Sequence, residues 1–370
     1  MSSAAPLYIS ATKQDTGKTT VTIGLVQGMR ALGYDVGYMK PVGQRYIQYE
    51  GLNIDEDAVL ALAAFGLKDH PGDMSPIAIE RGFTEHYIFN RDPAPLERRI
   101  LEAYEHIRQA HEFPIIEGTG HAGVGSCFDL SNARVAELLH AGVVIVTAGG
   151  IGRAIDEVAL SLHLFRKHGV RVLGVILNKV LPEKHAKVQR AVTEGLRHLG
   201  TRLLGAVPYR PELSLPRVEQ VVAELHCKWL IGRGGAHNLI RHTVVAAMEP
   251  SHMTKYIVDN TLVIIPGDRV DDLFCRHMTH PREHGIGGRI AGIVLTGGFV
   301  PAPLLCKSLD DANVPVLLCE EDTYTVATRL RELVFKIQPE DTDKIEAAQD
   351  LIRSSVDIPT IIEELRSEGP

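Results

Sequence analysis

The sequence predicts an α/β protein: a parallel sheet with helices on both faces, followed by a second, smaller α/β domain. Three observations support this fold class. Short β-branched runs alternate with longer amphipathic stretches over residues 1–210. Several of these runs end in turns that contain glycine or an acidic residue, and three prolines at 208–216 then interrupt the alternation. Strands that alternate with helices pair in parallel, so we expect polar chemistry at their carboxyl ends.

The elements of the first domain follow this pattern in order. Each strand candidate is a short apolar run, and each helix candidate carries apolar residues at helical spacing. The strand candidates are Leu7–Ser10, Val36–Met39, Pro114–Ile116, Val143–Thr147, Val172–Leu177 and Leu203–Val207. The helical stretches between them include Thr19–Leu32, Asp129–His140, Ala154–His168 and Glu183–Leu199.

The same pattern returns on a smaller scale after the prolines. We therefore predict a first domain at 1–210, a second at 211–335 and an acidic tail at 336–370 that forms a polar helix with a frayed end. The second domain has strand candidates Leu262–Ile265, Ala291–Leu295 and Val314–Leu318, and helix candidates Arg217–Leu225 and Val326–Phe335.

Composition narrows the class of protein. The net charge is −7 and the pI is near 6.2, which gives no electrostatic reason to expect nucleic acid or an anionic membrane as partner. No apolar run approaches the roughly 20 residues of a membrane span, and no signal peptide is evident. The five cysteines are scattered, odd in number and without a CxxC pair, which predicts reduced thiols in a cytoplasmic protein.

The sharpest motif is YISATKQDTGKTT at residues 8–20, which directly follows a strand and opens a helix. In a P-loop, backbone N–H groups and a helix N-terminus surround phosphate oxygens. Gly17 allows the close approach, Lys18 reaches the β- and γ-phosphates, and the Thr19 hydroxyl ligates Mg²⁺. The usual first glycine is replaced by Thr12. The predicted nucleotide-binding residues of the loop are Thr12, Lys13, Gln14, Asp15, Thr16, Gly17, Lys18, Thr19 and Thr20.

Two charged residues stand behind the loop at other strand ends. Lys40, in GYMKPVG, could face the γ-phosphate or a substrate; the alternative is an exposed lysine before a turn. Glu117, in IIEGTG, follows an apolar strand, as expected of an acid that holds Mg²⁺ opposite the loop; the alternative is an isolated glutamate at the sheet edge.

With these motifs, residues 1–210 resemble the dethiobiotin synthetase family of P-loop ATPases, whose fold also occurs in cobyrinate and cobyric acid synthases. The resemblance rests on the phosphate loop, on KPV at Lys40, on DEDA at Asp57, on EGTG at Glu117 and on Asn178 before Lys179. It implies catalytic roles for Lys18 and Lys40 and a Mg²⁺ site of Thr19, Asp57 and Glu117. It also implies that the Asn178 amide reads the base, although a turn-forming role is the alternative. ATP is favoured because the guanine-specific motif is incomplete. The family further implies a homodimer.

Residues 211–335 resemble the DRTGG domain through VVAAMEP, PGDRVD and IVLTGG. The two domains together resemble the N-terminal half of long bacterial phosphotransacetylases. The acetyltransferase domain of that family does not follow in this sequence, so we do not expect acetyl transfer. Lys13 stands at the position of the signature lysine of partition-type ATPases, which acts across a dimer. The neighbouring Gln14 and Asp15 depart from that motif, which favours a solvated loop lysine instead.

Two further clusters are weaker candidates. Asp268, Arg269 and the Thr296–Gly298 turn follow consecutive strands of the second domain, and they could form either a small-ligand site or an ion-paired turn. A metal site can also be drawn through the segment 275–284. Pro281 interrupts that segment, which favours a basic loop. Its candidate ligands are Cys275, His277, His280 and His284.

Two functions are compatible with these features. The first is a regulatory ATP-binding protein, in which ATP in the first domain biases the second and a protein partner in acetyl or carbon metabolism responds. The second is an ATP-dependent ligase that phosphorylates a carboxylate or carbamate for attack by an amine, with Lys18 and Lys40 stabilising the transferring phosphoryl group. The domain pairing favours the first, and fold alone does not decide between them.

Overall fold

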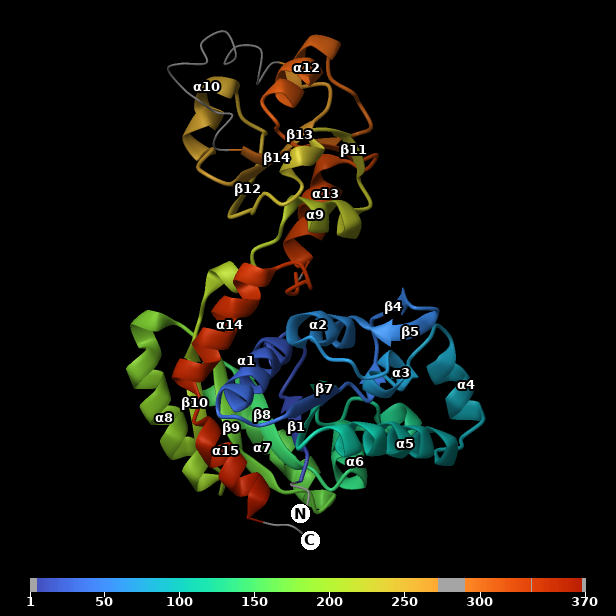
Figure 1. Cartoon of the computed structure of the whole chain (residues 1–370). Helices are drawn as coiled ribbons and strands as arrows, with labels where there is room; N and C mark the ends of the chain where they lie inside the picture. Colours follow the sequence, from blue (N-terminus) through green and yellow to red (C-terminus); the bar gives the residue numbers. More distant parts are fainter. Residues whose placement is uncertain (1–4, 272–289, 334, 368–370) are drawn as a thin grey trace. The chain divides into compact units, whose positions relative to one another are not determined.

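The structure is a computed structural model that describes residues 5–271, 290–333 and 335–367. The chain forms two compact units. Unit 1 comprises Met1–Leu213 together with Ile337–Pro370, and unit 2 comprises Ser214–Lys336 (Figure 1). Unit 2 is therefore inserted in the chain between two parts of unit 1.

Unit 1 is built on a six-stranded sheet in the order β10-β9-β8-β1-β7-β2. All of its pairs are parallel, which confirms the predicted sheet. Because β1 lies between β8 and β7, the loop that follows it stands at the middle of the carboxyl edge. The strands are β1 (Leu7–Ala11), β2 (Val36–Met39), β7 (Phe113–His121), β8 (Gly142–Ala148), β9 (Val172–Val180) and β10 (Leu203–Pro208).

Two hydrophobic cores cover the two faces of this sheet. Ile9 belongs to the core that α1, α2, α14 and α15 share, whereas its neighbour Tyr8 belongs to the core of α5, α6, α7 and α8. The helices are α1 (Lys18–Ala31), α2 (Glu56–Phe65), α3 (Pro71–Met74), α4 (Phe83–Phe89), α5 (Ala94–Ala110), α6 (Asn132–Leu138), α7 (Gly152–Lys167), α8 (His185–His198), α14 (Thr342–Ser355) and α15 (Ile358–Arg366). Two small strand pairs, β3 (Val42–Gly43) with β6 (Ile77–Ala78) and β4 (Tyr46–Tyr49) with β5 (Leu52–Asp55), were not predicted.

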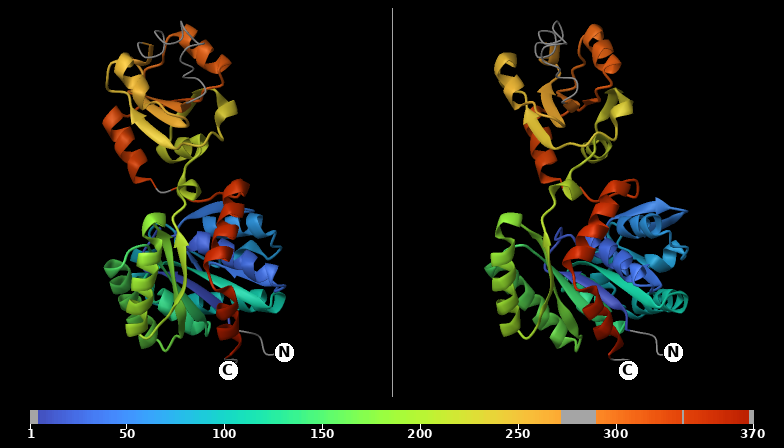
Figure 2. Two further views of the ribbon diagram at one scale, coloured as in Figure 1. Left: turned by 90° about the vertical axis from the view of Figure 1, so that its left-hand side faces the viewer. Right: turned by 60° about the vertical axis from the view of Figure 1, so that its left-hand side comes forward.

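The C-terminal segment differs from the predicted polar tail with a frayed end. It forms α14 and α15, which lie against α1 in unit 1 (Figures 1 and 2). Ile345, Ala348 and Ile352 are buried at spacings of three and four residues, so the acidic residues between them face outward. The helices approach closely at Gly24, where a Cβ atom would lie 2.2 Å from the Cβ of Ile352.

Unit 2 contains a mixed five-stranded sheet in the order β11-β15-β14-β13-β12, with β11 antiparallel to its neighbour. Its strands are β11 (Lys228–Ile231), β12 (His242–Val245), β13 (Thr261–Pro266), β14 (Ile290–Thr296) and β15 (Val316–Leu318). Its helices are α9 (Val218–Leu225), α10 (Pro250–Met253), α12 (Pro303–Asp311) and α13 (Thr323–Glu332). Short 3₁₀ turns occur at Ser126–Phe128, Pro182–Lys184, Pro211–Ser214, Arg233–Gly235 and Thr254–Tyr256.

The cysteines correct another expectation. Cys227 and Cys319 form a disulfide, whereas Cys127 and Cys306 are free. The antiparallel pairing of β11 with β15 brings this pair together across 92 residues of sequence, which the spacing along the chain could not indicate. In the part of the chain that the structure describes, no helix is both long and apolar enough to cross a membrane.

Candidate functional site

The phosphate loop lies between β1 and α1, as its sequence predicts. Gly17 has φ of 91°, and Lys18 is the first residue of α1. A Cβ atom on Gly17 would lie 2.3 Å from Nδ2 of Asn178, so both the backbone angle and the available space require glycine here. Lys18 and Thr16 are buried, whereas Gln14 and Asp15 are exposed and Lys13 and Thr20 are half-buried.

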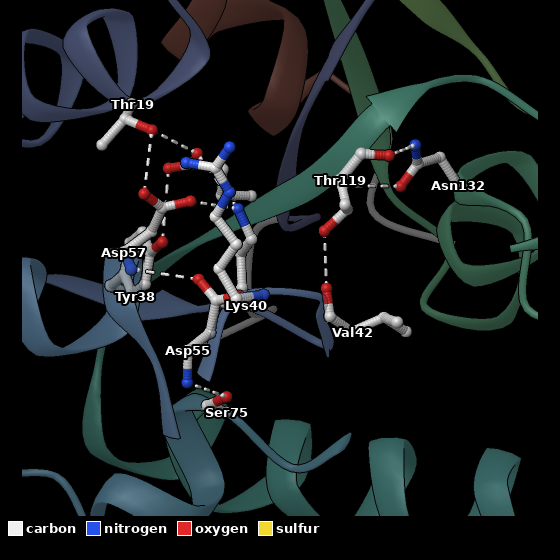
Figure 3. A network of polar contacts seen from close by, with 11 residues as sticks. Thr19, Tyr38, Lys40, Val42, Asp55, Asp57, Ser75, Thr119 and Asn132 are labelled. Atoms are coloured by element: carbon white, nitrogen blue, oxygen red, sulfur yellow. Dashed lines mark hydrogen bonds and ion pairs between the residues drawn. The ribbon is translucent and has the colours of Figure 1, made fainter. Parts of the chain in front are cut away.

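Three oxygen-bearing side chains from separate elements meet behind the loop (Figure 3). The Thr19 hydroxyl lies 2.9 Å from Oε1 of Glu117 and 3.3 Å from Oδ1 of Asp57. Thr19 is in the first turn of α1, Asp57 in the first turn of α2, and Glu117 on β7. Both carboxylates are buried, so the alternative of an isolated Glu117 at the sheet edge does not hold.

Lys40 lies within this acidic group. Its Nζ is 2.5 Å from Oδ2 of Asp57 and 3.4 Å from Oε1 of Glu117. Burial acts to lower the pKa of Lys40, but the negative charges of Asp57, Glu117 and Asp55 outweigh it and hold that pKa above its usual value. The lysine is therefore charged and buried rather than exposed before a turn.

Two residues that the sequence reasoning missed support the carboxylates. The Tyr38 hydroxyl lies 3.3 Å from Oε2 of Glu117. Burial and then the charge of Glu117 raise the pKa of Tyr38, so the phenol keeps its proton. Asp55 caps α2 by accepting a hydrogen bond from the backbone N–H of Asp57 at 3.0 Å. The sequence signals were present: Tyr38 lies on β2, two residues before Lys40, which follows that strand, and Asp55 precedes a helix.

Asn178 and Lys179, at the end of β9, hold the phosphate loop from the side. Nδ2 of Asn178 donates to the carbonyl of Thr16 at 2.8 Å, and Nζ of Lys179 donates to the carbonyl of Asp15 at 2.8 Å. Both side chains thus brace the turn. The prediction that the Asn178 amide reads a base stays a prediction.

Thr12, which replaces the usual glycine, connects the start of the loop to two other elements. Its Oγ1 donates to Oε2 of Glu157 on α7 at 2.9 Å and lies 3.1 Å from Oγ1 of Thr147 at the end of β8. Burial acts to raise the pKa of Glu157, but hydrogen bonds from Arg153 and Thr12 outweigh it and lower that pKa. The hydroxyl that a glycine lacks therefore ties β1, β8 and α7 together.

The donor set fits a hard divalent cation that is shared with phosphates. One hydroxyl and two carboxylates are ligands that Mg²⁺ accepts when phosphate oxygens and water complete its octahedron. Within the described residues, no group of three or more histidine, cysteine, aspartate or glutamate side chains could hold a metal by itself. The candidate ligands Cys275, His277, His280 and His284 lie outside the described residues.

The strand ends of unit 2 bring the other sequence-predicted stretches together. The backbone N–H of Gly267 donates to the carbonyl of Thr296 at 3.0 Å, so the segment of Asp268 and Arg269 adjoins the Thr296–Gly298 turn. Thr296 is buried and lies 2.7 Å from Oγ1 of Thr323, whereas Asp268 and Arg269 are exposed. A ligand at this edge stays a prediction.

Residues 5–217 match a family model described as an AAA domain (AAA_26), and residues 220–333 match the DRTGG domain. A phosphate acetyltransferase from Synechocystis sp. is 27% identical over 378 residues, which cover 98% of this chain and 52% of that protein. An ATP-dependent dethiobiotin synthetase from Methanocaldococcus jannaschii is 25% identical over 217 residues, which cover 56% of this chain and 96% of that protein.

The chain spans about half the length of the phosphate acetyltransferases it matches. Among solved structures, the MinD cell division protein of Aquifex aeolicus aligns with a TM-score of 0.37 at 15% identity, covering 57% of this chain and 84% of that one. The AAA-domain match extends over more than half of the chain. The chain therefore belongs to the AAA_26 family, with a dethiobiotin synthetase-like P-loop domain that is joined to a DRTGG domain.

Proposed function

We propose that this protein binds Mg·ATP at the β1–α1 loop and acts as a nucleotide-responsive regulatory protein. The observation that carries the proposal is the meeting of Thr19, Asp57 and Glu117 beside Lys18, at the start of α1. A phosphate loop with two buried carboxylates and a hydroxyl behind it has the parts needed to hold a nucleotide phosphate and its cation.

In this proposal the oxygen-bearing side chains bind the cation and the lysines bind or stabilise negative charge. Thr19, Asp57 and Glu117 hold Mg²⁺, which neutralises charge on the β- and γ-phosphates when bound. Lys18 and the loop N–H groups bind phosphate oxygens. Lys40 is a second buried cation beside the acids, positioned to stabilise negative charge at the same place.

The regulatory part of the proposal is supported by the path of the chain. Unit 2 lies in sequence between β10 and α14, and α14 packs along α1, the helix that begins at the phosphate loop. The contact is close: Gly24 of α1 has no room for a Cβ beside Ile352 of α14, and Gly28 has none beside Ile358 of α15. A change at the start of α1 on nucleotide binding therefore bears directly on the helix that receives the chain from unit 2.

The alternative is an ATP-dependent ligase that activates a carboxylate or carbamate for attack by an amine. The similarity to an ATP-dependent dethiobiotin synthetase favours it, and so does the buried charge of Lys40 beside the acids. In either case ATP and Mg²⁺ are the ligands. A homodimer and a protein partner in acetyl or carbon metabolism belong to the regulatory proposal as further expectations.

The test combines binding with turnover. ATP binding is measured by calorimetry with and without Mg²⁺, and phosphate release is measured alone and with diaminopelargonate plus bicarbonate. We expect Mg²⁺-dependent binding that Lys18→Ala abolishes, with little turnover under either condition. Turnover that appears only with the added pair and disappears in Lys18→Ala would establish the ligase. Absence of ATP binding in the wild type would refute both functions.

A further inference from the structure

The chain that follows Glu117 is held by one buried side chain, Asn132, the first residue of α6. Its Oδ1 accepts hydrogen bonds from the Tyr8 hydroxyl at 2.7 Å and from the Thr119 N–H at 3.1 Å. Its Nδ2 donates to the carbonyls of Thr119 at 2.7 Å and His121 at 2.6 Å. Asn132 is 4% exposed, and these four bonds use the full capacity of its amide.

The surroundings of Asn132 leave it little freedom. Tyr8 reaches it from β1, the strand that leads into the phosphate loop. A Cβ atom on Gly118 would lie 2.6 Å from Oδ1 of Asn132 and 2.8 Å from Cε1 of Tyr8. Gly118 follows Glu117 directly, so the amide is packed against the backbone next to the carboxylate.

Thr119 extends this network to the segment of Lys40. Its Oγ1 donates to the carbonyl of Val42 at 2.6 Å, two residues after Lys40 (Figure 3). The segments that carry Glu117 and Lys40 are thus joined by a hydrogen bond two residues beyond each charged side chain. Figure 3 shows Thr119 between Val42 and Asn132, while Lys40 and Asp57 lie on the other side of the network.

We propose that Asn132, together with Thr119, is a positioning pair for the metal site. The pair fixes the backbone of the Glu117 segment relative to that of Lys40, and so sets the affinity of the nucleotide-bound protein for Mg²⁺. Residues that orient metal ligands commonly change metal affinity by about 10- to 100-fold when replaced. This inference rests on the proposed Mg·ATP function. The sequence placed Asn132 inside the predicted helical stretch Asp129–His140, whereas in the structure it is the first residue of α6, after the cap Ser131.

The test measures the Mg²⁺ concentration that gives half-maximal binding of a fluorescent ATP analogue, and the affinity for that analogue in EDTA. Asn132→Asp keeps the size of the side chain but loses the two Nδ2 bonds. Thr119→Val loses only the hydroxyl bond, and Thr119→Ser keeps it. We expect Asn132→Asp and Thr119→Val to need at least about tenfold more Mg²⁺ with unchanged affinity in EDTA. Thr119→Ser should behave like the wild type.

Ser131→Ala is the matched control for a merely structural effect. It removes the cap bond from the Arg134 N–H to the Ser131 hydroxyl, next to Asn132, and leaves the Glu117 segment untouched. It should lower the melting temperature without changing the Mg²⁺ requirement.

Folded Asn132→Asp and Thr119→Val proteins with the wild-type Mg²⁺ requirement would refute the inference. An equal loss of affinity in EDTA would also refute it, because the effect would not involve the metal. Wild-type protein that binds no nucleotide would instead refute the proposed function, and this inference with it.

Discussion

Lys40 and Asp57 form a buried ion pair, with Nζ 2.5 Å from Oδ2 and side chains that are 4% and 5% exposed. The pair lies in the group of residues that we propose to hold Mg²⁺, and Glu117 is within 3.4 Å of the same ammonium. Lys40 therefore balances two carboxylates that would otherwise be buried together with like charge. Removing one partner of such a group is costly, because it leaves charge buried without compensation.

We predict that Lys40→Met destabilises the protein by about 3–5 kcal/mol in the absence of metal, since it removes the buried ammonium that lies beside Asp57 and Glu117. Mg²⁺ alone, without nucleotide, should then raise the melting temperature of the variant more than that of the wild type. Thermal unfolding with 0 and excess Mg²⁺ measures both effects. The double variant Lys40→Met/Asp57→Asn should recover stability and lose the response. Equal responses in wild type and Lys40→Met would contradict this assignment of charge.

Gly17→Ala should abolish nucleotide binding. The substitution combines a positive φ with a Cβ position 2.3 Å from Nδ2 of Asn178, so the loop or Asn178 must shift. Gly33→Ala is a matched control, because Gly33 also has φ of 91° but no atom lies within 4 Å of its Cβ position. The backbone strain of about 1–2 kcal/mol is common to both variants. We expect comparable losses of unfolding free energy from strain and loss of ATP binding in Gly17→Ala alone. Calorimetric binding that survives in Gly17→Ala would show that the contact with Asn178 is unimportant.

Nucleotide binding should change the hydrogen exchange of α14. Because Gly24 of α1 contacts Ile352 of α14 without intervening space, we expect Mg·ATP to slow hydrogen exchange in both α1 and α14. The helix α8 packs in the core on the opposite face of the sheet and should change less. Exchange followed by mass spectrometry resolves these helices, and Lys18→Ala should show no change. Slower exchange in α1 without any change in α14 would show that nucleotide binding does not affect α14, and it would contradict the proposed coupling.

The fluorescence of Trp229, the only tryptophan in the sequence, can report whether nucleotide binding in unit 1 affects unit 2. Trp229 is half-buried on β11. If the regulatory proposal holds, Mg·ATP changes its fluorescence emission in the wild type and not in Lys18→Ala. If the fluorescence emission of Trp229 does not change when Mg·ATP binds, the result would favour the ligase function over the regulatory function.

His111 should make stability depend on pH. Its Nε2 lies 3.0 Å from Asp69 and its Nδ1 3.1 Å from Asp35. The hydrogen bond with Asp69 raises the pKa of His111, burial opposes this rise, and Asp35 adds to it. A raised folded-state pKa means that the stabilisation is complete below the unfolded value of about 6.5 and is lost as pH rises through the folded value.

The measurement is urea unfolding of wild type and His111→Gln at pH 5.5 and pH 9. We expect a difference of about 1–2 kcal/mol at the lower pH that shrinks at the higher pH. His106→Gln is the control, because His106 is mostly exposed in its pair with Asp73 and should change little. A difference that grows with pH would reverse the sign and contradict the raised pKa.

Much of unit 1 could be predicted because its signals are local. Each strand of the six-stranded sheet is a short apolar run, and the alternation of strands with helices implies parallel pairing whatever the distant sequence. The phosphate loop is likewise contained in thirteen consecutive residues, 8–20, between a strand and a helix. The position of Lys40 directly after β2 follows from the same pattern, since carboxyl ends of parallel strands share one edge. Glu117 was expected just after its strand, but β7 continues to His121, so Glu117 lies within that strand.

The features that only the tertiary structure determines all depend on contacts between residues far apart in the chain. The polar composition of 336–370 gave no indication that Ile352 is buried against Gly24 of α1, where a Cβ atom would lie 2.2 Å from the Cβ of Ile352. Cys227 meets Cys319 through strand pairing across 92 residues. Asn132 lay inside the predicted helical stretch Asp129–His140 with no assigned role, and its bond with Tyr8, 124 residues away, depends on the tertiary structure. Sequence periodicity determines which face of an element is buried, but the identity of its partner depends on the packing of the whole unit.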